Sequence, residues 1–184
     1  MRQAVDLSRG LVLLDRDGVI NEDIHRWVVR LDDLRLLSNA LRAIARLSQA
    51  GVRVGVCTNQ GAVALGLLEE AMLAQIHEKL LRGVAGFGGA IERIVYCASV
   101  DENDFYRKPN AGMLLDQGRY FGCSLAGVPF VGDNWVDVQA ARAAGAVPVL
   151  VKTGNGARTA HKYRRFLDDV WVFPNLEEAV RQWV

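Results

Sequence analysis

Short apolar runs alternate with longer amphipathic stretches along the chain. The apolar runs are rich in Val, Ile and Leu and do not alternate strictly with polar residues, which is typical of strands buried on both faces. They lie at residues 11–14, 52–57, 91–97, 128–131, 147–151 and 171–173. Helical spacing of apolar residues appears at residues 39–50, 69–83, 110–121 and 134–145. This succession predicts an α/β fold of three layers, in which helices cover both faces of a mainly parallel sheet.

Capping residues mark several of the expected helix ends. Ser38 or Asn39 can cap the first helix, and Pro109 can open the third. Gly145 can close the fourth helix, and Asn175 can cap a last helix near the C-terminus. No internal repeat, low-complexity tract or linker interrupts the pattern. We therefore expect one domain that spans all 184 residues, a length sufficient for a single buried core.

The composition is typical of a globular protein, with 51% hydrophobic and 23% charged residues. The net charge of +1 creates no strong field, so we expect neither nucleic acid nor a membrane as partner. No apolar run is long enough to cross a bilayer, and the N-terminus lacks the apolar segment of a signal peptide. The three cysteines, Cys57, Cys97 and Cys123, are too few and too widely spaced for a disulfide framework. These features predict a cytoplasmic protein, which we expect to be monomeric.

Polar residues follow four of the predicted strands at the point where each strand ends. Asp15 and Asp17 come after the first strand, and Thr58 and Asn59 follow the second. Lys108 lies in the loop after the third strand, and Asp133 follows the fourth. Because ligands of open α/β sheets bind beyond the carboxyl ends of the strands, we expect these side chains to meet at one edge of the sheet.

Such a group of residues is suited to phosphoryl transfer. Carboxylate oxygens from Asp15 and Asp133 suit a partly hydrated Mg²⁺, which would offset the charge of an incoming phosphate. Lys108 would supply a fixed positive charge to the phosphoryl oxygens, and Thr58 a hydroxyl donor. Asp15 would attack phosphorus and form an aspartyl-phosphate. Asp17 would protonate the leaving alcohol and then activate water. The chain is therefore predicted to be a Mg²⁺-dependent phosphatase.

Four longer sequence words contain these residues. They are Leu-Asp-Arg-Asp-Gly-Val-Ile-Asn at residues 14–21, Cys-Thr-Asn-Gln at 57–60, Arg-Lys-Pro-Asn-Ala-Gly-Met-Leu at 107–114 and Val-Gly-Asp at 131–133. Together with Asp137, they resemble the four motifs of the haloacid-dehalogenase (HAD) superfamily. Within it they are most similar to the D-glycero-D-manno-heptose 1,7-bisphosphate 7-phosphatases and the related histidinol-phosphate phosphatases. The resemblance extends from about residue 11 to residue 154.

The resemblance implies a Rossmann-like HAD fold and a cytoplasmic step in making the heptose precursors of lipopolysaccharide. It implies Mg²⁺ held by Asp15, by the backbone carbonyl of Asp17 and by Asp133, with Asp137 orienting a ligand or the amine of Lys108. By motif position we expect a further set of residues to contact the substrate. These are Asp23, His25, Arg26, Asn59, Gln60, Arg107 and Asn134.

The chain departs from the family pattern at two places near the expected site. The family usually carries a zinc loop, Cys-x-His followed by Cys-x-Cys just before Arg-Lys-Pro. Here Cys97-Ala98-Ser99 and Asp104-Phe105-Tyr106 occupy those segments, so one candidate ligand remains. A structural zinc site needs four ligands, and we therefore expect no zinc. Leu65 also stands where the family has an arginine, which removes a cation near the substrate.

Cap domains set specificity in many members of this superfamily. The connection between residues 18 and 38 is too short for a folded cap, and residues 60–107 are largely used by one helix and one strand. We therefore expect an open site whose walls are the loops at residues 19–30 and 98–107.

Other functions fit parts of the same pattern. A histidinol-phosphate phosphatase, or another phosphatase of small phosphomonoesters, would use the same machinery. A phospho-accepting signalling module also places acidic residues, Thr and Lys at the ends of a parallel sheet. Its acceptor Asp, however, is not followed two residues later by Asp-Gly, as Asp15 is here. An inactive interaction protein is disfavoured because every catalytic motif is intact.

Overall fold

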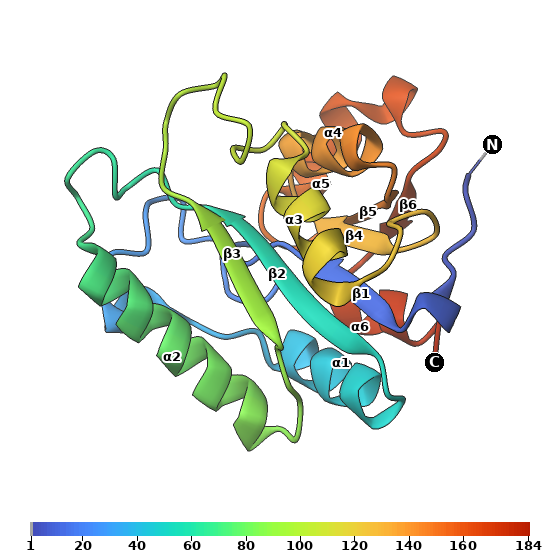
Figure 1. Ribbon diagram of the computed structural model, residues 1–184, viewed down its shortest axis with the longest axis horizontal. Coiled ribbons are helices and arrows are strands. Elements are labelled where there is room, and N and C mark those ends of the chain that lie inside the picture. Colours follow the sequence, from blue (N-terminus) through green and yellow to red (C-terminus); the bar gives the residue numbers. More distant parts are fainter. Residues whose placement is uncertain (1) are drawn as a thin grey trace.

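The computed structural model describes residues 2–184. Six parallel strands form one sheet in the order β3-β2-β1-β4-β5-β6 (Figure 1). The strands are β1 (Leu11–Leu14), β2 (Arg53–Asn59), β3 (Arg93–Cys97), β4 (Pro129–Gly132), β5 (Val147–Val151) and β6 (Trp171–Phe173). The α-helices are α1 (Ser38–Gln49), α2 (Glu70–Gly86), α3 (Gly112–Phe121), α4 (Trp135–Ala144), α5 (Gly156–Lys162) and α6 (Leu176–Val180). Three short 3-10 helices complete the structure: η1 (Leu7–Arg9), η2 (Leu31–Asp33) and η3 (Arg164–Phe166).

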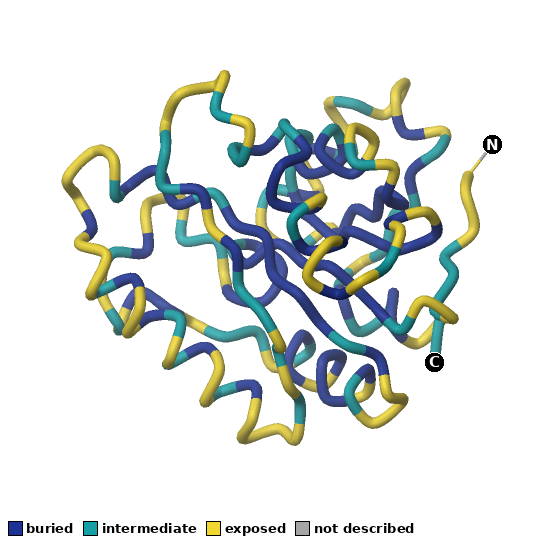
Figure 2. Tube along the Cα trace, viewed as in Figure 1, coloured by how far each residue is buried: buried dark blue, intermediate teal, exposed yellow. Residues whose placement is uncertain are grey.

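The central strand β1 is buried on both faces, which explains its unbroken apolar sequence. Successive side chains of a strand point to opposite faces. Val12 and Leu14 accordingly join the core beneath α1, α2 and α6, whereas Leu11 and Leu13 join the core beneath α3 and α4. Figure 2 shows the buried strands between partly exposed helices. The predicted three-layer α/β fold with a parallel sheet is confirmed.

Two of the predicted helix ends agree with the structure and two do not. Gly145 closes α4 with a φ of 73°, and the Asn175 side chain accepts a hydrogen bond from the backbone N–H of Glu178. The cap predicted for α1 is wrong, because the N-cap is Leu37, whose side chain makes no capping bond. The start predicted at Pro109 is also wrong: α3 begins at Gly112, because the preceding residues form a hydrogen-bonded loop at the site.

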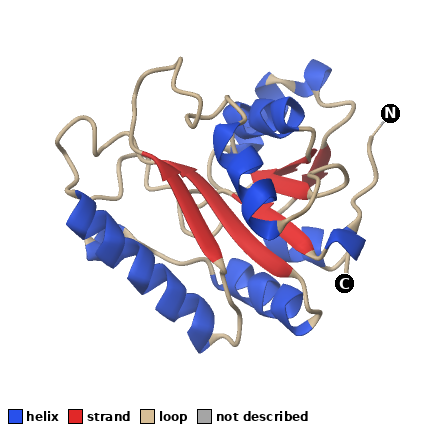
Figure 3. Ribbon diagram, in the orientation of Figure 1, coloured by secondary structure: helices blue, strands red, loops and turns tan. Residues whose placement is uncertain are grey.

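The connections at the carboxyl ends of the strands are loops rather than a folded cap. Between β1 and α1, the described chain forms turns, isolated bridges that join Asn21 to Asp17 and to Leu36, and the helix η2. Figure 3 shows long loops gathered beyond the arrowheads of β2 and β3. Helix α5 was not predicted, because seven residues that begin with Gly carry little periodicity. None of the helices in residues 2–184 is both long and apolar enough to span a bilayer.

Candidate active site

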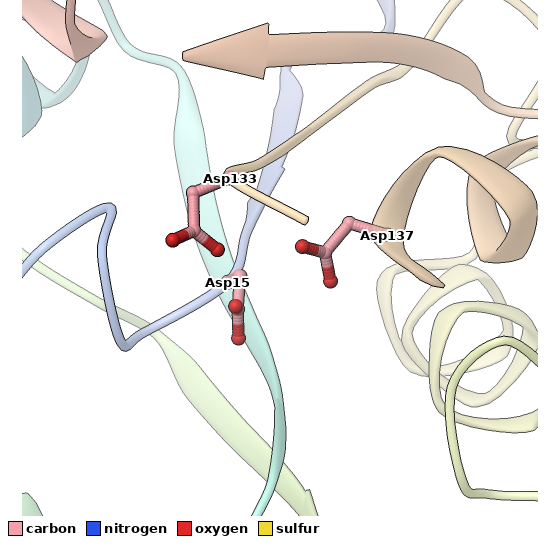
Figure 4. A group of neighbouring side chains, drawn as sticks. All are labelled: Asp15, Asp133 and Asp137. Atoms are coloured by element: carbon pink, nitrogen blue, oxygen red, sulfur yellow. The ribbon is translucent and has the colours of Figure 1, made fainter. Parts of the chain in front are cut away.

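Three carboxylates meet at the carboxyl ends of the two central strands. Asp15 follows β1, and its backbone N–H donates to the carbonyl of Val131 on the neighbouring strand β4 at 2.8 Å. Asp133 follows β4, and Asp137 lies on the first turn of α4. One oxygen from each carboxylate lies within 4.8 Å of the others, and the three side chains point toward a common centre (Figure 4). The adjacency of β1 and β4 therefore produces the acidic cluster.

Two glycines make this close approach possible. Gly18 has a φ of +78°, and a Cβ atom there would lie 2.1 Å from Oδ2 of Asp133. A Cβ atom on Gly132 would lie 2.2 Å from Cβ of Asp137. The glycines of Asp-x-Asp-Gly and Gly-Asp thus leave the space that the carboxylates occupy.

Lys108 provides the positive charge of the cluster. Its buried Nζ lies 2.8 Å from Oδ1 of Asp15 and 2.7 Å from Oδ1 of Asp137, and it donates to the carbonyl of Cys57 at 3.0 Å. Asn59 fixes the loop that carries the lysine, because its side chain accepts from the Lys108 backbone N–H and donates to the Lys108 carbonyl, both at 3.0 Å. Burial alone would lower the pKa of Lys108, but the charges of Asp137 and Asp15 outweigh it and raise that pKa. The ammonium is therefore a permanent charge.

The positive charge of Lys108 does not balance the three carboxylates of the cluster. Burial raises the pKa of Asp15 to about 7 and the pKa of Asp133 to about 8, and the neighbouring Asp137 acts in the same direction. Three carboxylates facing one ammonium leave two negative charges in a buried place. A divalent cation would balance them, and carboxylate oxygens are the ligands that Mg²⁺ prefers. The donor set therefore fits Mg²⁺.

Asp17 is held apart from this cluster by a separate set of donors. Arg16, whose side chain is fully buried, donates to both carboxylate oxygens at 2.9 and 3.0 Å. Asn21 donates to one oxygen at 2.9 Å, and Gln60 to the other at 3.0 Å. Burial opposes ionisation, but the charge of Arg16 and these hydrogen bonds hold the pKa of Asp17 below its usual range. A phosphate ester nearby would raise that pKa, because a like charge disfavours the ionised form.

Comparison with known proteins decides the family. A HAD-hydrolase-like family model matches residues 105–179. The D-glycero-beta-D-manno-heptose-1,7-bisphosphate 7-phosphatase of Pseudomonas aeruginosa is 46% identical over 85% of this chain and 88% of that protein. The enzyme of the same name from Bordetella bronchiseptica is 45% identical over 81% of this chain and 84% of that protein. The chain belongs to this heptose-bisphosphate phosphatase family.

A solved structure agrees with this assignment. The D,D-heptose 1.7-bisphosphate phosphatase of B. bronchiseptica, complexed with magnesium and phosphate, matches with a TM-score of 0.90 and 41% identity. The match covers 94% of this chain and 97% of that structure. The predicted phosphatase activity is thereby confirmed over the signalling-module alternative.

Beside the acidic cluster, this phosphatase has a cavity of about 240 Å³. Most of the residues predicted from the sequence line it. They are Asp15, Asp17, Asp23, Arg26, Thr58, Asn59, Gln60, Lys108, Asp133, Asn134 and Asp137. The structure thus brings together residues from all four motifs and from the loop after β1. Their individual roles in binding and catalysis stay predictions.

Two residues predicted to contact substrate do not line the cavity. His25 has a φ of 57°, and its side chain is 80% exposed, because the turn at Asp23 directs it outward. Arg107 donates to the carbonyl of Ser99 at 2.7 Å, and its guanidinium lies next to Gly61, where a Cβ atom would be 3.5 Å from it. The Arg107 guanidinium is therefore bonded within the loop of residues 98–107 and does not line the cavity.

Four cavity residues are absent from the predicted site. They are Trp27, Val28, Val136 and Asn155. Asn155 had a visible signal, because it stands between two glycines after a buried strand, as residues of ligand-binding loops often do. The first three carry no polar signal and become wall residues only through folding.

Proposed function

We propose that this phosphatase removes the 7-phosphate of D-glycero-β-D-manno-heptose 1,7-bisphosphate with Mg²⁺. The observation that carries the proposal is the buried cluster of Asp15, Asp133, Asp137 and Lys108 at the end of a cavity lined by polar side chains. The β-anomer is favoured because relatives at 45–46% identity carry it in their names. This step would supply heptose precursors of lipopolysaccharide.

We propose a role for each group that would surround the phosphate of the substrate. An oxygen of Asp15 attacks phosphorus and forms an aspartyl-phosphate while the bond from phosphorus to the sugar oxygen breaks. Asp17, protonated as the phosphate approaches, gives its proton to the departing sugar oxygen. Lys108 and the hydroxyl of Thr58 stabilise the phosphoryl oxygens as charge develops on them. Asp17 then accepts a proton from the water that hydrolyses the aspartyl-phosphate, which restores the enzyme.

Three groups of this chain would hold the metal. They are the side chains of Asp15 and Asp133 and the backbone carbonyl of Asp17. Bound Mg²⁺ supplies the positive charge that lets a phosphate approach these carboxylates. Asp137 has another role: Oδ1 lies beside Lys108 and Oδ2 accepts from the backbone N–H of Asn134 at 2.9 Å. Asp137 therefore orients the lysine.

We propose that the loop of residues 98–107 is ordered without zinc. Side chains bond several of its backbone groups: Asn110 donates to the carbonyls of Glu102 and Asp104, and Asp101 accepts from the backbone N–H of Asn103. Cys97 is buried in the core beneath α3. Metal analysis of the purified protein tests this proposal, and one zinc per chain would contradict it.

We also propose that the enzyme is a single-domain, cytoplasmic monomer that acts on a small phosphorylated sugar and binds neither nucleic acid nor membrane. The net charge of +1 supports the absence of polyanion binding. Light scattering after size-exclusion chromatography tests the monomer, and fractionation of cells tests the location.

The decisive experiment assays the purified protein with Mg²⁺ on both anomers of the heptose bisphosphate and on histidinol phosphate. We expect the β-anomer to be hydrolysed with the highest kcat/KM and Asp15→Asn to abolish turnover. Asp169→Asn, which removes an exposed partner of Arg142, is the matched control. Turnover by Asp15→Asn would refute the nucleophile, and a preference for histidinol phosphate would refute the substrate.

A further inference from the structure

The loop of residues 153–156, between β5 and α5, contributes a side chain to the cavity although it belongs to none of the four motifs. Asn155 lines the cavity wall. Its backbone N–H donates to Oδ2 of Asp133 at 2.7 Å, and its side-chain amide donates to Oδ2 of Asp23. The same side chain accepts from Arg158 at 3.0 Å. One residue thus joins a proposed metal ligand to the loop that faces the substrate.

The 153–156 loop is fixed in place by its own packing. The hydroxyl of Thr153 donates to the carbonyl of Gly18 at 2.6 Å. Gly154 has a φ of +53°, and a Cβ atom there would lie 2.6 Å from the Cα of Gly18. A Cβ atom on Gly156 would lie 1.6 Å from the carbonyl oxygen of Val151. Because neither glycine leaves room for a Cβ atom, the 153–156 loop packs directly against Gly18 and Val151.

The side-chain amide of Asn155 bonds one of the two oxygens of the Asp23 carboxylate, Oδ2, which also lies 3.8 Å from Nδ1 of His25. The Asp23 side chain is 16% exposed, and its other oxygen, Oδ1, accepts from the backbone N–H of His25 at 2.7 Å. Each oxygen of an ionised carboxylate can accept two hydrogen bonds. With one bond on each oxygen already made, the carboxylate keeps one acceptor site per oxygen for hydroxyl groups in the cavity. A pair of neighbouring sugar hydroxyls matches that arrangement.

We propose that Asn155 is a positioning residue that sets the sugar specificity of the phosphatase by holding Asp23 toward the hydroxyls of the substrate. This inference rests on the proposed function. It separates two roles within one residue: the backbone N–H supports Asp133, whatever the side chain, whereas the side chain acts on Asp23. A substitution of the side chain should therefore weaken binding of a polyhydroxylated substrate and leave phosphoryl transfer intact.

The test compares Asn155→Ala and Asn155→Asp on the heptose bisphosphate and on p-nitrophenyl phosphate, which has no sugar hydroxyls. For Asn155→Ala we expect a KM for the heptose bisphosphate about tenfold higher, with kcat and the activity on p-nitrophenyl phosphate changed by less than about twofold. Asn155→Asp should raise KM further, because two carboxylates would face each other. Asn175→Ala, which removes another half-buried Asn side chain outside the cavity, should change neither kinetic constant.

A double-mutant cycle with Asp23→Ala tests whether Asp23 is the residue through which Asn155 acts. In that background, Asn155→Ala should have no further effect on KM. Additive effects, or equal losses on both substrates, would overturn the inference. The cycle is also read in the midpoint of thermal unfolding, which needs no substrate: we expect Asn155→Ala to lower it by about 3 °C in the native background and by less than about 1 °C beside Asp23→Ala. If the native protein does not hydrolyse the heptose bisphosphate, the proposed function fails. The unfolding midpoints still show whether Asn155 and Asp23 interact.

Discussion

Replacing Lys108 with methionine removes the ammonium that faces the carboxylates of the site. Methionine keeps much of the length of the side chain, so the change is mainly one of charge. The ammonium is 2% exposed and pairs with Asp15 at 2.8 Å and with Asp137 at 2.7 Å. Removing one partner of a buried ion pair costs about 3–5 kcal/mol, because the remaining charges stay buried without compensation. This is a large part of the total stability of a domain, about 5–15 kcal/mol.

Catalysis should fall as well. In the proposed mechanism Lys108 is the fixed charge for the phosphoryl oxygens, and loss of one such group lowers kcat by about 10²–10³-fold. Metal binding should change in the opposite direction. With one positive charge fewer beside the carboxylates, the Mg²⁺ concentration that gives half-maximal activity should fall. General damage to the site would raise it, so the two explanations predict opposite signs.

The assay combines urea unfolding, with and without Mg²⁺, and steady-state kinetics on the heptose bisphosphate. Lys79→Met is the matched control, because the ammonium of Lys79 donates to a backbone carbonyl, that of Leu31, rather than to a carboxylate. Its loss should cost about 1 kcal/mol and leave kcat unchanged. A kcat of Lys108→Met within about threefold of the native value, or an unchanged free energy of unfolding, would refute the reasoning.

Three further predictions follow from the same site. Gly154→Ala would place a Cβ atom 2.2 Å from Oδ2 of Asp133, and we expect the Mg²⁺ requirement to rise at least about tenfold in an activity titration. Asp17→Asn should lower kcat by about 10²–10⁴-fold on the heptose bisphosphate but far less on p-nitrophenyl phosphate, whose leaving group needs no proton; equal losses would exclude Asp17 as the acid. In a chelator, the stability of the protein should fall as pH rises from about 4 to about 8, because the pKa values of Asp15 and Asp133 are raised to about 7 and about 8, so the folded state binds protons that the unfolded chain releases. Mg²⁺ should therefore raise the unfolding midpoint more at pH 8 than at pH 5.5, and an equal rise at both values would contradict this linkage.

Much of the fold and of the catalytic centre follows from local sequence. The apolar run at residues 11–14 is a strand because four consecutive apolar residues need cover on both faces, and the structure provides it. Asp15 and Asp133 could be assigned to one edge of the sheet in advance, since the carboxyl ends of parallel strands lie at the same edge, whereas the adjacency of β1 and β4 appears only in the structure. The turn at Gly18 could also be predicted from local sequence, because glycine readily adopts the positive φ that lets the chain turn after Asp17. Helix starts were less predictable: Leu37 precedes α1 without a capping side chain, since packing can replace that bond.

The tertiary structure alone decided which residues form the wall of the site. Nothing near Asp23 in the sequence indicates that Asn155, 132 residues later, holds its carboxylate. His25 lies two residues from Asp23 but faces solvent, because one turn reverses the direction of its side chain. Short motifs constrain only the chain within a few residues, so they predict Asp15, Asp17 and Lys108 as site residues. Orientation and specificity depend on contacts between loops whose positions are set by the order of strands in the sheet, and that order appears only when the whole chain has folded.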